Sequence, residues 1–374
     1  MHIASHHRTA AKKCIIYQEG MDATWRRGSM GRPTIMDVAA RAGVSQSTAS
    51  LALRGSNRVR PATRERVLQA AEELHFTLSR SASSLASGRT MRIFMLVSPA
   101  LNTWFNGAIM QGAYKALHRH GYDLIPYAVS NDAELSEFFA TLRGGKNADG
   151  AIVSSFDLND DFKRLLKTLD IPTIGLNTPT TEGFDASVCI DNIAAMGNAV
   201  RFLHSQGHRH LAFVEEPDFE PFSFSSSLRS RGFLDAARQL GYADDDLTVI
   251  RGEQTEGYHS PQDAISQIVA RLLSAPKRPT GICVETDGFA VTLMQELRRQ
   301  QLRIPEDCSV IGFDDDTVAA AVELTTIHQD PMTLGRRAAE LVLKLIQHEA
   351  VESPHRIQET SLVLRNTTGP APRQ

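Results

Sequence analysis

The sequence predicts a small all-α unit followed by a two-lobed α/β domain. Two observations lead to this prediction. Between residues 31 and 76, apolar residues recur at helical spacing in three short groups that are separated by turn signals. From residue 91 onward, short apolar runs alternate with amphipathic segments, a pattern typical of βαβ units.

The N-terminal unit carries clear signals for three helices. Thr34 is a favourable N-cap, with Asp37 three residues later, and Gly43 can adopt the left-handed conformation that ends a helix. Ser45 then caps a second helix, and Pro61 starts a third. Two short helices joined by so tight a turn indicate a helix-turn-helix, whose second helix presents its first residues to base edges in the major groove.

Charge separates this unit from the rest of the chain. Residues 31–90 contain nine Arg, no Lys and four acidic residues, a net charge of +5, whereas residues 91–374 carry −11 and the whole chain −3. A basic head on an acidic body is typical of a protein that binds a polyanion through the head alone. The residues alone leave two alternatives open: a basic face that is simply solvated, and a helical bundle that binds another protein.

The chain is expected to have five parts. Residues 1–30 lack an apolar signal core, so they are expected to be a disordered or over-called start in a cytoplasmic protein. Residues 31–76 form the headpiece, the Ser-rich residues 77–90 a hinge, residues 91–365 the two lobes, and residues 366–374 a tail. No apolar stretch reaches the length of a membrane span. The four cysteines are far apart and are expected to be free thiols: Cys14, Cys189, Cys283 and Cys308.

Nine strands are expected in the body, too many for one simple sheet. Two doubly wound lobes should result, with a cleft at the carboxyl ends of the strands, where ligands bind in open α/β sheets. The expected strands are 92–98, 122–129, 150–155, 172–177, 187–191, 210–216, 247–252, 280–286 and 308–314.

Several motifs, in order, resemble the lactose/galactose-repressor family of bacterial transcriptional regulators. The resemblance covers nearly all of residues 31–365. Its motifs are Thr34-Ile-Met-Asp-Val-Ala39, Ala42-Gly-Val-Ser45, Thr63-Arg-Glu-Arg-Val67, Ser81-Ala-Ser-Ser-Leu85, Val188-Cys-Ile-Asp-Asn192, Gly207-His-Arg209, Arg229-Ser-Arg-Gly-Phe233, Ile304 to Asp315, and Leu324-Thr-Thr-Ile327.

The resemblance implies a homodimeric regulator with a periplasmic-binding-protein-like body, in which a bound ligand changes the affinity for a pseudo-palindromic operator. It also implies that Leu85 wedges into the minor groove of the operator. Leu51 departs from the family, which commonly has Arg or His there, and Arg54 replaces a usual Asn. The expected DNA-binding residues are Thr34, Ser45, Gln46, Ser47, Thr48, Ser50, Leu51, Arg54, Ser79, Arg80 and Leu85.

For the effector, the resemblance points to residues at the ends of strands and helices in the cleft. Carboxylates, a guanidinium and aromatic faces suit a sugar, because they bind vicinal hydroxyls and cover a pyranose ring. Phe219, Phe222 and Phe224 are expected to extend the aromatic platform. A neutral sugar or short oligosaccharide is therefore expected, with no cofactor. The expected effector residues are Trp104, Phe105, Asn177, Arg229, Thr286, Asp287 and Asp314.

Other functions are weighed against this one. His204, His208 and His210 resemble metal ligands, but Gly207 interrupts the helix between them, so no metal site is expected. The chain lacks a GxGxxG after its first body strand, a GxxxxGK[ST] and a GxSxG, so an enzyme is not expected. Two alternatives stay open: a catabolite regulator controlled by a phosphoprotein, and a periplasmic-type sugar-binding protein. The C-terminal residues contain no leucine heptad, which favours a dimer over a tetramer.

Overall fold

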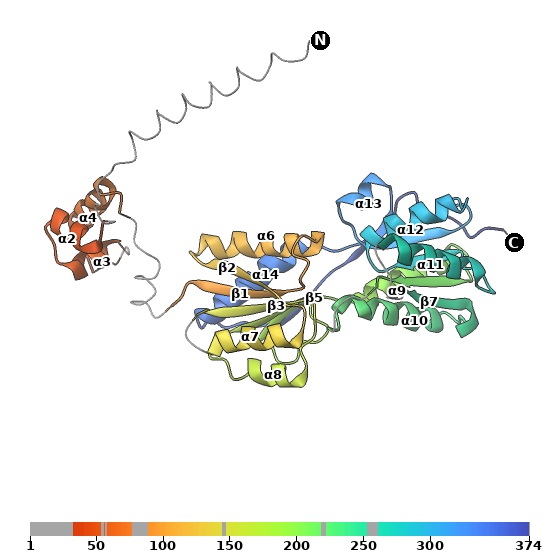
Figure 1. The fold of residues 1–374 in the computed structure, drawn as a ribbon, viewed down its shortest axis with the longest axis horizontal. Coiled ribbons are helices and arrows are strands. Elements are labelled where there is room, and N and C mark those ends of the chain that lie inside the picture. Colours follow the sequence, from red (N-terminus) through yellow and green to blue (C-terminus); the bar gives the residue numbers. More distant parts are fainter. Residues whose placement is uncertain are drawn as a thin grey trace, which may run out of the picture. The chain divides into compact units, whose positions relative to one another are not determined.

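The computed structural model describes residues 33–53, 56, 58–76, 89–143, 147–217, 222–252 and 261–373, without the side chains of 261–263. The chain divides into two compact units, Met1–Gly88 and Arg89–Gln374, called here the headpiece and the body (Figure 1). The expected disordered start and residues 77–88 of the expected hinge lie outside the described residues. Within the described ranges, no helix is both long enough and apolar enough to cross a membrane.

The headpiece contains the three predicted helices, α2 (Ile35–Ala42), α3 (Gln46–Leu53) and α4 (Pro61–Glu73). Thr34 and Asp37 form a capping box at the start of α2, and Gly43 ends that helix with a φ of 65°. The Ser45 hydroxyl accepts a hydrogen bond from the Thr48 N–H at 3.2 Å and so caps α3. Small apolar side chains from all three helices form one core, which confirms the helix-turn-helix.

The body has two lobes, each built on a six-stranded sheet that is parallel except for one antiparallel edge strand in the C-terminal lobe. The N-terminal lobe has the strand order β11-β5-β4-β3-β1-β2, and α6 (Trp104–Arg119) and α14 (Pro331–Ile346) cover one face while α7 (Asp132–Arg143) and α8 (Asp160–Leu166) cover the other (Figure 1). Its strands are β1 (Arg92–Val97), β2 (Asp123–Ala128), β3 (Gly150–Ser154), β4 (Thr173–Leu176), β5 (Ala186–Ile190) and β11 (His355–Gln358).

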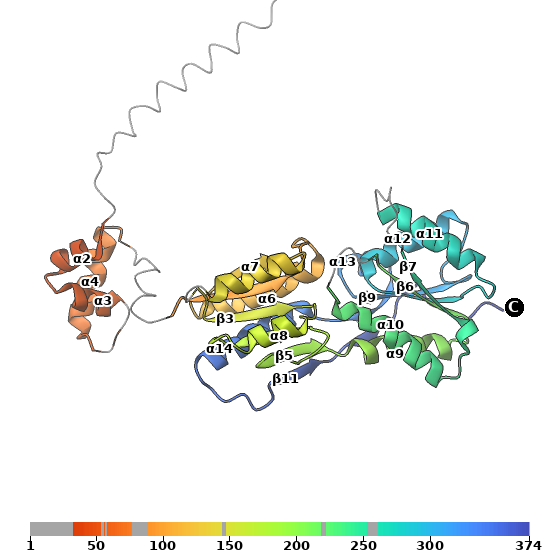
Figure 2. The same cartoon turned by 60° about the horizontal axis from the view of Figure 1, so that its bottom comes forward.

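The C-terminal lobe repeats this plan with the strand order β12-β10-β9-β8-β6-β7. Helices α9 (Asn192–Ser205) and α10 (Leu228–Gln239) cover one face, and α11 (Pro261–Ser274) and α12 (Asp287–Arg299) cover the other (Figure 2). The short α13 (Thr317–Ala321) follows β9. The strands of the C-terminal lobe are β6 (Leu211–Glu215), β7 (Leu247–Arg251), β8 (Gly281–Val284), β9 (Ser309–Asp314), β10 (Thr325–His328) and β12 (Ser361–Val363).

The chain passes between the lobes three times, after β5, after β10 and after β11. These crossings place the carboxyl ends of both sets of parallel strands at the junction of the lobes. All nine predicted strands are present, so the two-lobed doubly wound prediction is confirmed. Three strands were not predicted, β10 to β12, each of only three or four residues.

Two glycines allow α6 and α14 to pack with their backbones in contact. A Cβ added at Gly112 would lie 2.0 Å from the Met332 carbonyl oxygen, and one added at Gly335 would lie 2.0 Å from the Ile109 carbonyl oxygen. Any side chain at either position would therefore push the helices apart. Because α6 begins at Trp104, this close packing fixes the position of the pocket residues at its N-terminus.

Residues next to both expected ends of the body make specific contacts with it. The N–H groups of Thr90 and Met91 donate to the Asp149 carboxylate at 2.7 and 2.9 Å, so residue 90 is tied to the body rather than to a hinge. The expected tail also packs on the C-terminal lobe: Thr367 is 2% exposed, and its hydroxyl donates to the Val310 carbonyl at 2.7 Å. Cys189, Cys283 and Cys308 are buried free thiols, as expected, and Cys14 lies outside the described residues.

Candidate functional site

The outer face of α3 is the candidate DNA-binding surface of the headpiece. Gln46, Ser47 and Leu51 are exposed and Ser50 is half-buried, whereas Ala49 and Ala52 are buried in the core. Residues four positions apart lie one above the other on a helix, so the four outer residues form two adjacent rows. The structure therefore brings four of the expected DNA-binding residues to one surface.

The other expected DNA-binding residues have different positions. Thr34 and Ser45 use their hydroxyls as helix caps, and the Thr48 hydroxyl lies 2.8 Å from that of Ser45. These three residues fix the helix ends that position the outer face of α3. Four further residues lie outside the described residues: Arg54, Ser79, Arg80 and Leu85.

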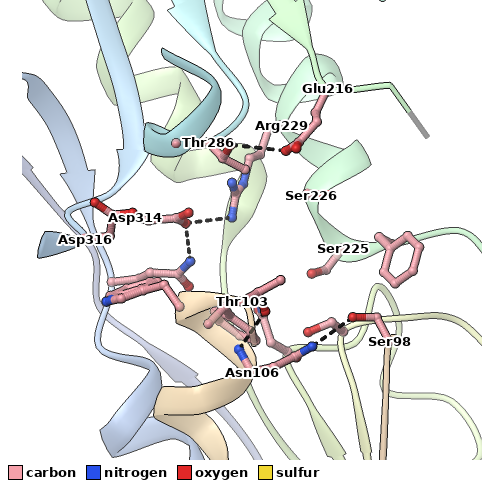
Figure 3. A pocket seen from close by; sticks show the side chains of 17 residues that line it. Ser98, Thr103, Asn106, Glu216, Ser225, Ser226, Arg229, Thr286, Asp314 and Asp316 are labelled. Atoms are coloured by element: carbon pink, nitrogen blue, oxygen red, sulfur yellow. Dashed lines mark hydrogen bonds and ion pairs between the residues drawn. The ribbon is translucent and has the colours of Figure 1, made fainter. Parts of the chain in front are cut away.

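The body contains a pocket of about 370 Å³ lined by both lobes (Figure 3). On the N-terminal side, Thr103 caps α6 by accepting from the Asn106 N–H, and the Asn106 side-chain amide donates to Ser98 Oγ at 2.9 Å. Trp104 and Phe105, the first two residues of α6, also line the pocket. This wall therefore combines aromatic rings with uncharged hydrogen-bonding groups.

The facing wall is built around Arg229 of α10, which is 4% exposed. Its guanidinium lies 3.5 Å from the Phe313 ring centroid, and it donates to Asn192 Oδ1 at 3.0 Å and to the Glu285 carbonyl oxygen. It also pairs with Asp314 Oδ1 at 3.5 Å. Because each of these partners restrains the fork, Arg229 presents a fixed orientation to the pocket.

Carboxylates from neighbouring strand ends surround this guanidinium. Glu216 follows β6 and accepts from the Thr286 hydroxyl at 3.2 Å. Burial, reinforced by the Glu285 carboxylate, raises the pKa of Glu216 to about 7. Burial also raises the pKa of Asp314 to about 6, against the opposing effect of Arg229. Two carboxyls with raised pKa values beside one buried cation mark a candidate binding site.

The backbone at the pocket is held in an uncommon conformation. Ser155, Asn177 and Asp314 all line the pocket and have φ values of 73°, 49° and 119°. Positive φ values at residues other than glycine are uncommon and concentrate at functional sites. Each of these residues directly follows or ends a strand, so the strained segments present their side chains at the sheet edges.

Six of the seven expected effector residues line the pocket, and Asp287 does not. Its side chain is fully buried, where Oδ1 accepts from the Thr326 hydroxyl at 2.6 Å and Oδ2 from the Asp316 N–H at 3.0 Å. The expectation for Asp287 is corrected accordingly: it positions the segment after β9 instead of facing the cavity. Burial, reinforced by Asp314, raises the pKa of Asp287 to about 8.

The aromatic platform expected before Arg229 is smaller than the sequence suggested. Phe224 lines the pocket, but Phe222 is 7% exposed and stacks on Phe156 at 4.9 Å in the N-terminal lobe. Phe224 also forms a β-bridge to Phe156, and Phe219 lies outside the described residues. The segment leading into α10 therefore joins the two lobes as well as lining the cavity.

Sequence reasoning missed several lining residues, of which Gln329 is the most informative. Gln329 is 1% exposed, its Nε2 donates to Asp314 Oδ1 at 2.6 Å, and its Oε1 has no hydrogen-bond partner among the described residues. The signal was its position one residue after β10, a strand that was not predicted. The other missed polar residues of the lining are Ser98, Thr103, Asn106, Ser155, Glu216, Ser225, Ser226 and Asp316.

The ring nitrogens of the three histidines face different neighbouring groups rather than one shared point. His208 is fully buried and bonds to Thr280 Oγ1 and the Gly369 carbonyl at 2.9 and 3.1 Å. His204 Nδ1 bonds to the Tyr242 hydroxyl at 3.2 Å, and His210 Nδ1 lies 3.2 Å from Asp246 Oδ1. Over the ranges that the structure describes, no group of three His, Cys, Asp or Glu side chains could hold a metal ion.

A helix-turn-helix headpiece, together with a polar pocket between two α/β lobes, defines a ligand-controlled DNA-binding transcriptional regulator. Residues 34–79 match the family described as bacterial regulatory proteins, lacI family, and residues 200–368 match a periplasmic binding protein-like domain. The chain is 30% identical over 345 residues to the HTH-type transcriptional repressor CytR of Escherichia coli (strain K12), a match that covers 91% of this chain and 97% of CytR. The chain belongs to the lacI family of bacterial regulatory proteins.

Solved structures share the fold of this chain. The lac repressor dimer bound to operator and the anti-inducer ONPF has the same fold, with a TM-score of 0.78, 24% identity, and coverage of 91% of this chain and 100% of that one. The complex of the transcriptional regulator CelR with cellobiose matches with a TM-score of 0.63, 27% identity, and coverage of 90% and 100%.

Proposed function

We propose that this regulator is a cytoplasmic repressor that binds a pseudo-palindromic operator as a homodimer, and that a neutral sugar or short oligosaccharide in the body pocket controls its affinity for DNA. In this proposal the protein is not an enzyme and needs no cofactor. The outer face of α3 reads bases, and the basic residues of the headpiece contact phosphates. The cellobiose bound to CelR supports a sugar as the effector class.

The observation that carries the effector proposal is the composition of the pocket lining. Its hydroxyl, amide and carboxyl groups both donate and accept hydrogen bonds, as a sugar hydroxyl does. Trp104 supplies an indole for the face of a pyranose ring. Arg229 and Asp314 together offer a donor fork beside an acceptor, which suits a pair of vicinal hydroxyls.

Charge argues against a phosphorylated ligand. Arg229 is the only cationic side chain in the described lining, and it is already paired with Asp314. Glu216 and Asp316 add two further carboxyls to the same cavity. A phosphate would face these carboxylates without a spare cation, so its desolvation would not be compensated.

The test combines two measurements on the full chain. Selection of bound DNA from a random pool identifies the operator, and fluorescence anisotropy on that DNA then measures how ligands change the affinity. A panel of neutral mono- and disaccharides, with their phosphate esters, is titrated by calorimetry and in the anisotropy assay. We expect at least one neutral sugar to bind and to shift operator affinity; a response confined to sugar phosphates, or to a phosphoprotein, would reject this effector class.

A further inference from the structure

The outer face of α3 contains an apolar side chain that the headpiece core does not use. The sequence of α3, Gln-Ser-Thr-Ala-Ser-Leu-Ala-Leu, has two leucines with different surroundings. Leu53 packs against the core formed by α2, α3 and α4, whereas Leu51 is not among the residues of that core and is 37% exposed. Leu51 is therefore partly exposed, and it lies beside Ser47 on the surface that faces outward.

The same face has no charge. None of the eight residues of α3 is Arg, Lys, Asp or Glu. Arg41, on the neighbouring α2, is held by a salt bridge from its Nη2 to Glu73 Oε2 at 2.7 Å. Guanine is most often recognised in the major groove by Arg or Lys, which bind O6 and N7 together. The helix itself offers no such group.

The side chains of α3 instead match the major-groove edges of adenine and thymine. A glutamine amide binds adenine N6 and N7 with two hydrogen bonds, and an apolar side chain contacts the 5-methyl group of thymine. Gln46 and Leu51 supply one of each on adjacent rows of one face. A serine hydroxyl bonds to several base edges and adds little discrimination.

We propose that Leu51 determines specificity by contacting the 5-methyl group of a thymine, so that the bases of each half-site under α3 are mainly A·T pairs. This inference rests on the proposed recognition of operator DNA by α3. Its distinguishing consequence is sensitivity to a single methyl group. Removing one such methyl group should weaken binding roughly fourfold. Removing it from both half-sites of a palindrome should weaken binding by roughly the square of that factor.

The experiment uses the operator obtained from the random pool. Each thymine of a half-site is replaced in turn by deoxyuridine, which keeps the base pair and removes only the 5-methyl group. Affinity is measured by fluorescence anisotropy for the wild type, for Leu51→Ala and for Leu68→Ala. Leu68 is 50% exposed on α4 and serves as a matched surface leucine; circular dichroism checks that each variant is folded.

We expect one thymine per half-site at which deoxyuridine weakens wild-type binding roughly fourfold, and we expect Leu51→Ala to abolish that sensitivity while Leu68→Ala keeps it. Leu51→Arg should move the preference at the same base pair toward guanine. Specific binding that is equally sensitive to deoxyuridine in the wild type and Leu51→Ala would overturn the assignment of Leu51 and leave operator recognition intact. A pool without any enriched sequence would overturn operator recognition, and the assignment of Leu51 with it.

Discussion

Gln329 donates a hydrogen bond from Nε2 to Asp314 Oδ1 at 2.6 Å, and the other Asp314 contact in the pocket comes from Arg229. Asp314 has a φ of 119°, an uncommon value for a residue with a side chain. Donors from two different elements thus hold the Asp314 carboxylate at the junction of the lobes, on a residue whose backbone conformation is uncommon. Since β10 leads into Gln329 and then into α14 of the other lobe, Asp314 is hydrogen-bonded to the segment that joins the two lobes.

Replacing Asp314 should separate effector binding from DNA binding. Loss of a charged partner in a buried, hydrogen-bonded site costs about 2–5 kcal/mol, so Asp314→Ala should weaken sugar binding by more than about tenfold. Operator affinity without sugar should stay near the wild-type value. Calorimetry measures the first quantity and anisotropy the second. Asp161→Ala, at an exposed carboxylate of α8, is the control; a wild-type sugar response in Asp314→Ala would contradict the effector proposal.

Gln329 should make a smaller contribution. Its Oε1 has no partner among the described residues, so a donor hydroxyl of the ligand would complete its hydrogen bonding. A hydrogen bond between neutral groups is worth about 0.5–1.5 kcal/mol. Gln329→Ala should therefore weaken sugar binding by a few-fold up to about tenfold, and Gln329→Glu should weaken it further because a second carboxylate would face Asp314. Unchanged binding in both variants would exclude Gln329 from ligand contact.

The ligand-free body should lose stability as the pH rises. The folded-state pKa of Asp287 is about 8, far above its ordinary value of 3.8. Its protonated form is favoured in the fold, so its contribution is fully present below pH 4 and is lost as the pH rises through about 8. The free energy of unfolding should fall over this window, with a slope of at most about 1.4 kcal/mol per pH unit for one proton.

Denaturant unfolding of the wild type and Asp287→Asn from pH 5 to 9 measures this effect. The variant should keep most of the wild-type stability at pH 5, because an uncharged amide resembles the protonated carboxyl of Asp287. Its stability should depend less on pH, because the amide does not titrate. Parallel curves for the two proteins would show that Asp287 is ionised in the folded state.

The proposed insertion of Leu85 into the minor groove predicts different effects on operator DNA and on random DNA. Leu85 lies outside the described residues, and its role is proposed from the family resemblance. A wedge contributes only where the duplex is kinked. Leu85→Ala should therefore lose most operator binding, keep its affinity for random DNA, and keep sugar binding in the body. Equal losses on operator and random DNA would contradict a wedge.

The oligomeric state can be tested directly. A homodimer would present two α3 helices to two half-sites, so one dimer should bind one operator. Sedimentation equilibrium at micromolar concentration should give twice the chain mass of 41.1 kDa. A stable tetramer, or a monomer that binds the operator with full affinity, would contradict the proposed assembly.

The sequence alone determined the local structure of this protein. Helix caps at Thr34 and Ser45, the left-handed Gly43 and the apolar runs of the nine predicted strands are local signals, and each produced the expected element. Six of the seven residues expected to bind an effector line the pocket, because the carboxyl ends of parallel strands meet at one edge. The charge of +5 on residues 31–90 likewise required no coordinates.

The orientation of the side chains at the cavity depends on contacts between residues far apart in the sequence. Asp314 is the last residue of β9, and Asp287 begins α12, three residues after the end of β8. Asp287 is turned into the protein by Thr326 and the Asp316 N–H, whereas Asp314 lines the pocket, where it contacts Gln329 and Arg229. Strand β11 is short and largely exposed, and β12 has only three residues, so neither provides an apolar run long enough to predict a strand. β11 pairs with β5 and β12 pairs with β10, each at the edge of a sheet, after the chain has crossed between the lobes. Such long-range pairing leaves no periodic signal in the sequence of the strand itself.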